Sequence, residues 1–215
     1  MLDLKLSIVY VMNKLIEIKG FHTCYYRQGD CKAELVNLVP FLCNPHKVQW
    51  LGIGYYFWTD SPHFAHEWGK FGYSGEYSIN QFSIIMNRDK LLDLIGTVSD
   101  QLKFQNFIQQ LFNTLERILD KNPEMDNCRI RQKLQRVRNG VVSTVIELSR
   151  EFKLLDFWAI KAADIPKSSQ EYRFKEKGRS EILVLPTRQQ VVIYEEAKEC
   201  IIYDSWIYPV ESHEE

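Results

Sequence analysis

The chain has 215 residues, enough to bury a hydrophobic core of its own, and its 45% hydrophobic and 26% charged content is that of a folded globular protein. A net charge of −1 excludes a global attraction to nucleic acid or to an anionic membrane. Five cysteines, without a CxxC pair, indicate reduced thiols in a cytoplasmic protein. The N-terminal apolar run is too short and too polar to span a membrane and lacks a signal-peptide cleavage site, so no membrane partner is expected.

The first hundred residues predict strands that alternate with short helices. Apolar spacing and β-branched or aromatic content predict strands over 16–23, 53–58 and 76–86 and helices over 30–43, 63–71 and 87–96. The first of these helices is expected to stop near Pro40. Asp60 and Ser61 are expected to cap the helix over 63–71, with Pro62 at its first position.

The remainder predicts a helical region followed by strands. Apolar residues recur every three or four positions from Ser99 to Asp120, which predicts an amphipathic helix of about six turns. A second helix over 129–152 is expected to bend or break at Asn139–Gly140. Strands are expected over 180–186, 189–194 and 199–209. We therefore expect one α+β domain over residues 1–215, in which 97–152 is a helical insertion on a β-rich body.

The segment LGIGYYFWTDSPHFAHEWG, residues 51–69, places two glycines directly before an aromatic strand. Glycine lacks a Cβ, so Gly52 and Gly54 permit left-handed backbone angles or the close approach of a ligand. Strand alternation puts Tyr56 on one face, where its ring is suited to stacking on a flat heterocycle. A turn with ordinary core packing explains the same pattern. No third glycine and no Gly-Lys-Ser/Thr follows, so neither a dinucleotide fingerprint nor a phosphate loop is present.

His22 at the end of the first strand, the segment 51–69 and TRQQVVIY at 187–194 together resemble the ADP-ribosyltransferase superfamily. The similarity is to its His-Tyr-Glu branch, which includes diphtheria-toxin-like enzymes and poly(ADP-ribose) polymerases, and within it to small bacterial toxin-like members with an LGxGxYFW motif. The resemblance implies a split β-sheet core, NAD as the substrate, and a toxin or phage-defence effector that an antitoxin protein restrains.

The same resemblance assigns roles to residues of this chain. It implies that His22 donates a hydrogen bond to the NAD ribose, that Tyr56 stacks on nicotinamide and that Trp68 covers the other nicotinamide face. Thr23 takes the place of a small residue beside which NAD passes, and Gly52 and Gly54 complete the NAD-binding set. Gln190 stands where the family usually has a glutamate that binds the ribose 2′-hydroxyl.

Glutamine at that position changes the expected chemistry. Cleavage of the nicotinamide–ribose bond passes through an oxocarbenium-like centre, which the uncharged amide of Gln190 cannot stabilise as a carboxylate would. We expect mono-ADP-ribosyl transfer to a protein or nucleic-acid acceptor that supplies its own nucleophile, or help from a nearby carboxylate: Glu181, Glu195 or Glu196. The alternative is a catalytically inactive module that binds a protein or nucleic acid through the helical insertion.

Two further clusters have plain structural explanations. Cys24, Cys31, Cys43 and His46 do not have the spacing of a structural zinc site, so no metal is expected. The segment 129–138 carries five basic side chains that could contact phosphates or could form a solvated helix face: Arg129, Arg131, Lys133, Arg136 and Arg138.

Overall fold

The computed structural model describes residues 14–47, 49–121, 128–139, 141–151, 154, 156–176 and 178–210. It is a mixed α+β structure, as expected, built on a mixed sheet of seven strands. The strand order is β4 (Leu91–Asp93), β5 (Ala159–Asp164), β8 (Arg188–Ile193), β2 (Tyr55–Thr59), β1 (Leu15–Tyr25), β3 (Tyr77–Asn87) and β9 (Ile201–Tyr208). Only the β4–β5 pair within this sheet is parallel.

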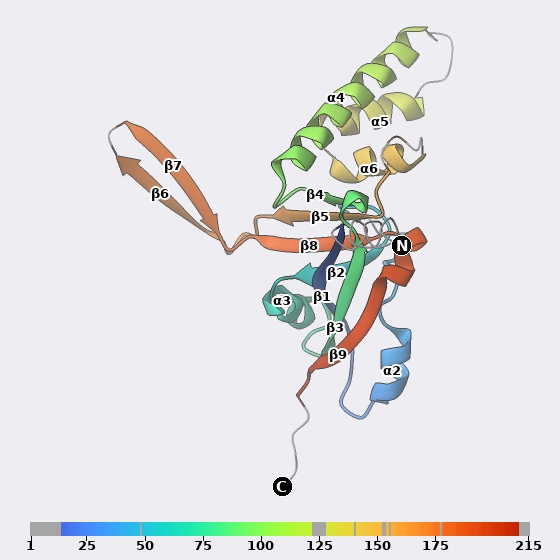
Figure 1. The fold of residues 1–215 in the computed structure, drawn as a ribbon, viewed down its shortest axis with the longest axis vertical. Helices are drawn as coiled ribbons and strands as arrows, with labels where there is room; N and C mark the ends of the chain where they lie inside the picture. Colours follow the sequence, from blue (N-terminus) through green and yellow to red (C-terminus); the bar gives the residue numbers. More distant parts are fainter. Residues whose placement is uncertain are drawn as a thin grey trace, which may run out of the picture.

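The sheet divides between β1 and β2. These two strands pair at only two positions, Gly20 with Thr59 and Phe21 with Trp58, whereas β1 pairs with β3 along its whole length. Figure 1 shows the result: β5 and β8 run across the molecule, and β1, β3 and β9 run at a steep angle to them. The divergence begins at His22, the residue that follows the last β1–β2 pair.

Strand β2 places alternate aromatic side chains on opposite faces of the sheet, as its sequence predicts. Tyr55 and Phe57 pack into one core cluster with Phe82 and Ile84 of β3. Tyr56 borders a second cluster, under the helices. Three of the five β2 residues bury large aromatic rings, which ties both halves of the sheet to this short central strand.

Three helices cover one face of the β4–β5–β8 half (Figure 1). They are α4 (Val98–Lys121), α5 (Cys128–Arg138) and α6 (Val142–Glu151), and they lie between β4 and β5 in the chain. The apolar stripe of α4 is buried, and α6 packs directly on the sheet through Val145, Ile146 and Leu148. The predicted long helix and the predicted break near Asn139 are therefore confirmed.

The prediction of a helix over 87–96 is wrong. Only Arg88–Lys90 form a 3₁₀ turn, after which Leu91 and Leu92 are buried in β4. The side chain of Asp93 then accepts hydrogen bonds from the backbone N–H groups of Ile95 and Gly96, which turns the chain instead of continuing a helix. Pairing with β5, which comes from a distant part of the chain, overrides the local helical preference.

The sequence also left two strands unpredicted, β5 and β6 (Gln170–Glu176). Strand β6 pairs with β7 (Arg179–Leu185) as a separate hairpin that projects from the body between β5 and β8 (Figure 1). The Ala-rich stretch AIKAAD of β5 has a single β-branched residue, Ile160, which is too weak a local signal for a strand, and its place between β4 and β8 makes it one.

The two short helices of the first half are α2 (Lys32–Leu38) and α3 (His63–Gly72). Helix α3 begins at His63, as the predicted range has it, but Pro62 is the N-cap residue and not the first helical residue, and the Ser61 hydroxyl accepts a hydrogen bond from the His63 N–H at 3.2 Å. Ala65 is fully buried against the sheet, and the missing side chain of Gly69 leaves room for the ring of Tyr77. Helix α3 is thereby fixed beside the ends of β1 and β3.

Candidate functional site

A hollow of about 500 Å³ opens where β1 and β2 diverge. Five residues that the sequence nominated line it, from four elements spread over the chain: His22, Thr23, Tyr56, Trp68 and Gln190. The segment between α2 and β2 supplies a further wall of the hollow, including Phe41, Lys47 and Trp50. The structure therefore brings together residues that are far apart in the sequence.

His22 is buried at the point where the strands separate. Its Nδ1 lies 2.9 Å from the carbonyl oxygen of Tyr56, and burial lowers the pKa of the imidazole from 6.5 to about 4. A carbonyl oxygen only accepts, so the single proton of the neutral ring is on Nδ1 and Nε2 is an acceptor. Nε2 is buried, and no group among the described residues forms a hydrogen bond with it; the Phe41 ring stands edge-on to the imidazole, with the ring centroids 4.5 Å apart.

The hydrogen-bonding role implied by the resemblance is therefore reversed. In this protonation state His22 cannot donate to a ribose hydroxyl through Nε2, but it can accept a hydrogen bond from one. An unpaired acceptor in a buried position costs folding free energy, which a ligand hydroxyl would recover. Because Nε2 is buried, a ligand can reach it only after a neighbouring side chain moves, and Phe41 is the neighbour of the imidazole that also lines the hollow.

Tyr56 presents its ring to the hollow, but its hydroxyl is engaged by the backbone. Oη donates to the carbonyl oxygen of Gly52 at 2.7 Å and accepts from the N–H of Leu51 at 3.1 Å. Burial raises the pKa of the phenol well above its ordinary value, so the hydroxyl stays protonated. Tyr56 can therefore offer an aromatic face to a ligand, while its hydroxyl holds the turn before β2.

Gln190 lies on β8 opposite Trp58 of β2 and faces the hollow. Its Oε1 accepts a hydrogen bond of 2.8 Å from the indole Nε1 of Trp50. Trp50 thus joins the wall segment before β2 to the strand that carries Gln190. Sequence reasoning gave no role to Trp50, because its partner is 140 residues away.

Thr23 and Trp68 lie on the α3 side of the hollow. The Thr23 hydroxyl is buried and donates to the carbonyl oxygen of Ala65 at 3.0 Å, so it ties β1 to α3. Trp68 is 46% exposed on α3, and its ring lies over Gly72. An aromatic side chain is therefore available at the hollow from α3, as predicted, while the hydroxyl of Thr23 is committed to the protein.

The two glycines do not line the hollow, contrary to the sequence-based prediction. Gly52 has a left-handed φ of +84°, and a Cβ there would lie 3.3 Å from the Ile146 side chain of α6. A Cβ on Gly54 would lie 2.6 Å from the carbonyl oxygen of Ile193 on β8. Both glycines permit close approach within the protein, Gly52 to α6 and Gly54 to β8.

The carboxylate that lines the hollow is Asp164, which sequence reasoning missed. It is the last residue of β5 and forms an ion pair with Arg188, its register partner at the start of β8, with one N–H···O bond of 2.8 Å. The carboxylate raises the pKa of the Arg188 guanidinium. Together with Lys47, these charges leave the hollow with a net positive balance that suits a phosphate-bearing ligand. Arg188 was within reach of prediction, because it is part of the TRQQVVIY motif.

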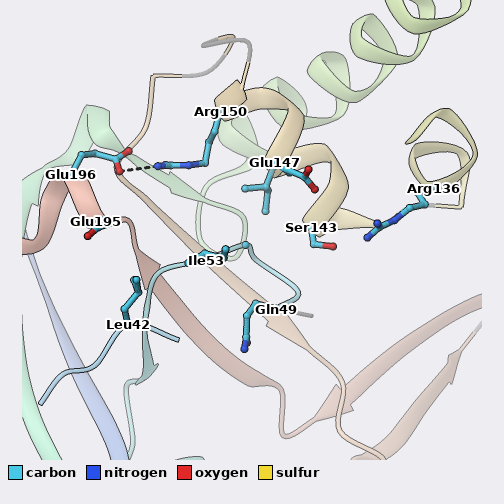
Figure 2. A pocket seen from close by; sticks show the side chains of 11 residues that line it. Leu42, Gln49, Ile53, Arg136, Ser143, Glu147, Arg150, Glu195 and Glu196 are labelled. Carbon is cyan, nitrogen blue, oxygen red and sulfur yellow. Dashed lines mark hydrogen bonds and ion pairs between the residues drawn. The ribbon is translucent and has the colours of Figure 1, made fainter. Parts of the chain in front are cut away.

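The three glutamates proposed as helpers lie elsewhere. Glu181 is exposed on β7 of the projecting hairpin. Glu195 and Glu196 line a second hollow of about 460 Å³, together with residues of α6 and of the turn at Gln49–Ile53 (Figure 2). There Glu196 accepts a hydrogen bond of 2.8 Å from Arg150. Their prediction as helpers of the same site is therefore wrong, because Glu181 lies on the hairpin before β8, Glu195 and Glu196 follow β8, and none of the three lines the hollow.

Two of the four described basic side chains of the stripe on α5 form ion pairs with neighbouring helices. Lys133 forms an ion pair of 2.9 Å with Glu151 of α6, and Arg138 forms one of 2.7 Å with Glu116 of α4. The side chain of Arg129 lies outside the described residues. These pairs brace α5 against its neighbours and reduce the local positive charge.

The four described cysteines of the sheet and its loops, Cys24, Cys31, Cys43 and Cys200, are free thiols. Over the described ranges, no three His, Cys, Asp or Glu side chains gather in a way that would hold a metal ion. A search of the described helices for one that is long and apolar enough to cross a membrane found none.

Comparison with known proteins adds no assignment to this geometry. No family model matches the chain, and neither a curated protein nor a solved structure is similar to it at a significant level.

Proposed function

We propose that the protein binds NAD in the hollow at the β1–β2 split and transfers its ADP-ribose to a macromolecular acceptor. The observation that carries the proposal is the convergence of His22, Tyr56 and Gln190, from three different strands, on one hollow. Three separate sequence motifs nominate these residues, and none of the motifs specifies how the strands pair. The fold therefore brings together three residues that the resemblance had selected without knowledge of the strand pairing.

The chemistry of the lining is consistent with a dinucleotide. Tyr56 and Trp68 offer aromatic surface for nicotinamide, whose ring stacking is worth about 0.5–1.5 kcal/mol beyond buried area. His22 Nε2 offers an acceptor to a ribose hydroxyl, and Lys47 and Arg188 offer cations to the pyrophosphate. Nε2 is buried, so entry of the ribose requires a side chain beside the imidazole to move, and Phe41 lies both there and at the hollow.

In the proposed reaction the bond between nicotinamide nitrogen and ribose C1′ breaks, and its electron pair leaves with nicotinamide. The acceptor then bonds to C1′ and loses its proton to solvent. His22 is neutral and Gln190 is uncharged, so the developing cation is stabilised by aromatic faces and amide dipoles. Asp164 is the carboxylate at the hollow, but both of its oxygens already accept hydrogen bonds from Arg188. The acceptor therefore has to be a good nucleophile in its own right.

The alternative, a non-catalytic module that binds nucleic acid through α5, has less support. Ion pairs with acidic neighbours already occupy Lys133 and Arg138. We therefore regard the helical layer as a cover for the sheet and not as the primary binding surface.

The proposal is tested by NAD binding in calorimetry and by nicotinamide release in chromatography. We expect Tyr56→Ala to weaken binding by about tenfold or more, through lost stacking and a loosened turn. Gln190→Ala leaves the Tyr56 contacts in place and is expected to reduce nicotinamide release. Gln109→Ala, at an exposed position on α4, is the matched control and should behave as the wild-type protein. A wild-type protein that binds no NAD at millimolar concentration would refute the proposal.

A further inference from the structure

The amide of Gln190 has a defined orientation. An indole N–H only donates, so the atom of Gln190 that lies 2.8 Å from Trp50 Nε1 is the oxygen. Within the described part of the chain, no group accepts a hydrogen bond from the amide nitrogen, Nε2. The side of Gln190 left for a ligand is therefore a donor, whereas a glutamate in its place would offer only acceptors.

Trp50 is well placed to hold that orientation, because its neighbours in the chain are fixed. Leu51 is fully buried, and its carbonyl oxygen accepts a hydrogen bond of 2.9 Å from Tyr194 Oη. Its N–H donates to Tyr56 Oη, which in turn donates to Gly52. The turn is therefore bonded to β2 and to the residue that follows β8, so the backbone that carries Trp50 is held in place, and the hydrogen bond to Gln190 orients the indole itself.

His22 has the complementary polarity. Its Nδ1–H is used by the Tyr56 carbonyl, and its Nε2 is an unpaired acceptor. A hydroxyl group has one proton, so a hydroxyl that donates to His22 can only accept from its next protein neighbour. A donor at Gln190 satisfies that requirement, and an acceptor there does not.

We propose that Trp50 is a positioning residue that turns Gln190 into a hydrogen-bond donor, so that the hollow selects a ribose hydroxyl that donates to His22 and accepts from Gln190. This inference rests on the proposed NAD site for its ligand. It explains why glutamine at this position is a working partner for a neutral histidine and not a weakened glutamate.

The positioning half is tested without any ligand. In ¹⁵N-labelled protein, the indole resonance of Trp50 is identified by its loss in Trp50→Phe. We expect this proton to exchange slowly with solvent in the wild-type protein. Gln190→Ala should shift its resonance and speed its exchange. An indole signal that is the same in wild-type protein and Gln190→Ala would show that the bond does not form, and would overturn the positioning role.

The ligand half is tested by NAD affinity in calorimetry. Trp50→Phe keeps an aromatic side chain but removes the N–H that orients the Gln190 amide. We expect NAD to bind about 3- to 10-fold more weakly, the usual effect of one neutral hydrogen bond. Gln190→Glu should weaken binding more than Trp50→Phe, because two acceptors then face one hydroxyl. The control is Trp206→Phe, which also loses an indole hydrogen bond, to Pro209, but outside the hollow.

The outcomes separate this inference from the proposed function. If the wild-type protein binds NAD and Gln190→Glu binds it equally well or more tightly, the donor role of Gln190 is wrong while the NAD site stands. If the wild-type protein binds no NAD, the proposed function and the ligand half of the inference fail together, and the indole measurement alone decides whether Trp50 positions Gln190.

Discussion

At the scale of single residues, the hollow is defined by the direction of a few buried hydrogen bonds. Backbone pairing between β1 and β2 ends at Phe21. Beyond it, the side chain of His22 supplies the contact between the two strands, because its Nδ1–H donates to the Tyr56 carbonyl. That bond fixes the tautomer and leaves Nε2 without a partner. The same residue therefore closes the gap between two strands and supplies an acceptor to the hollow.

The neutral state of His22 makes stability depend on pH. Its pKa is about 4 in the folded protein and 6.5 in the unfolded chain, so between these values only the unfolded chain binds the proton. The stability that neutral His22 contributes is fully present above pH 6.5. As pH falls toward 4, the free energy of unfolding decreases by about 3 kcal/mol in total. Urea unfolding of the wild-type protein at pH 7.5, 6 and 5 should follow this decline.

His22→Asn is the informative comparison for this pH dependence, because the asparagine amide can still donate to the Tyr56 carbonyl and does not titrate. We expect a flatter dependence of unfolding free energy on pH in His22→Asn than in the wild-type protein. His46→Asn, at an exposed position, should retain the wild-type slope. Equal slopes for all three proteins would mean that His22 is not held neutral.

At the scale of elements, the position of β2 against β8 sets the distance between Tyr56 and Gln190. Tyr55, at the start of β2, pairs with Ile193, and the residue before it has no room for a side chain. Gly54 is therefore required for the central strand to reach its partner. The turn that carries Trp50 precedes this contact and depends on it.

Gly54→Ala is expected to destabilise the protein by about 3 kcal/mol, because the new methyl group overlaps the Ile193 carbonyl and the Val192 side chain. Gly96→Ala, where the added Cβ meets only the Asp93 carboxylate at the surface, should change stability much less. Thermal and urea unfolding would measure both. A Gly54→Ala protein as stable as Gly96→Ala would contradict the role assigned to this strand contact.

At the scale of the whole molecule, the β6–β7 hairpin stands apart from the body (Figure 1). It pairs only with itself in the sheet topology, although it joins two strands that line the hollow. It exposes several large apolar side chains: Tyr172, Phe174, Ile182, Leu183 and Leu185. The hairpin therefore adds solvent-exposed surface to the molecule and buries few side chains in the core.

Replacing residues 165–187 by an Asn-Gly turn should leave the body intact. Asp164 and Arg188 are register partners on antiparallel strands, which a two-residue turn can join. We expect the free energy of unfolding to change by less than about 1 kcal/mol, since a shorter connection costs little entropy to close. Calorimetric unfolding would test this. A loss of cooperative unfolding would show that the hairpin stabilises β5 and β8.

Short motifs in the sequence are enough to locate most of the hollow. They nominate residues 22, 56, 68 and 190, and strong local signals predict β1, β2, β3 and α4. Residues 41, 50 and 164 cannot be found in this way. Each acts through a partner distant in the sequence, such as Trp50 on Gln190.

The sequence by itself therefore determined which aromatic and polar side chains are available, and the α+β character of the chain, because periodicity and glycine placement are local properties. Only the tertiary structure decided where β1 and β2 part and which carboxylate reaches the hollow. It also decided which groups at the hollow are hydrogen-bond donors and which are acceptors. These depend on strand pairing between distant segments and on burial, and a local pattern specifies neither.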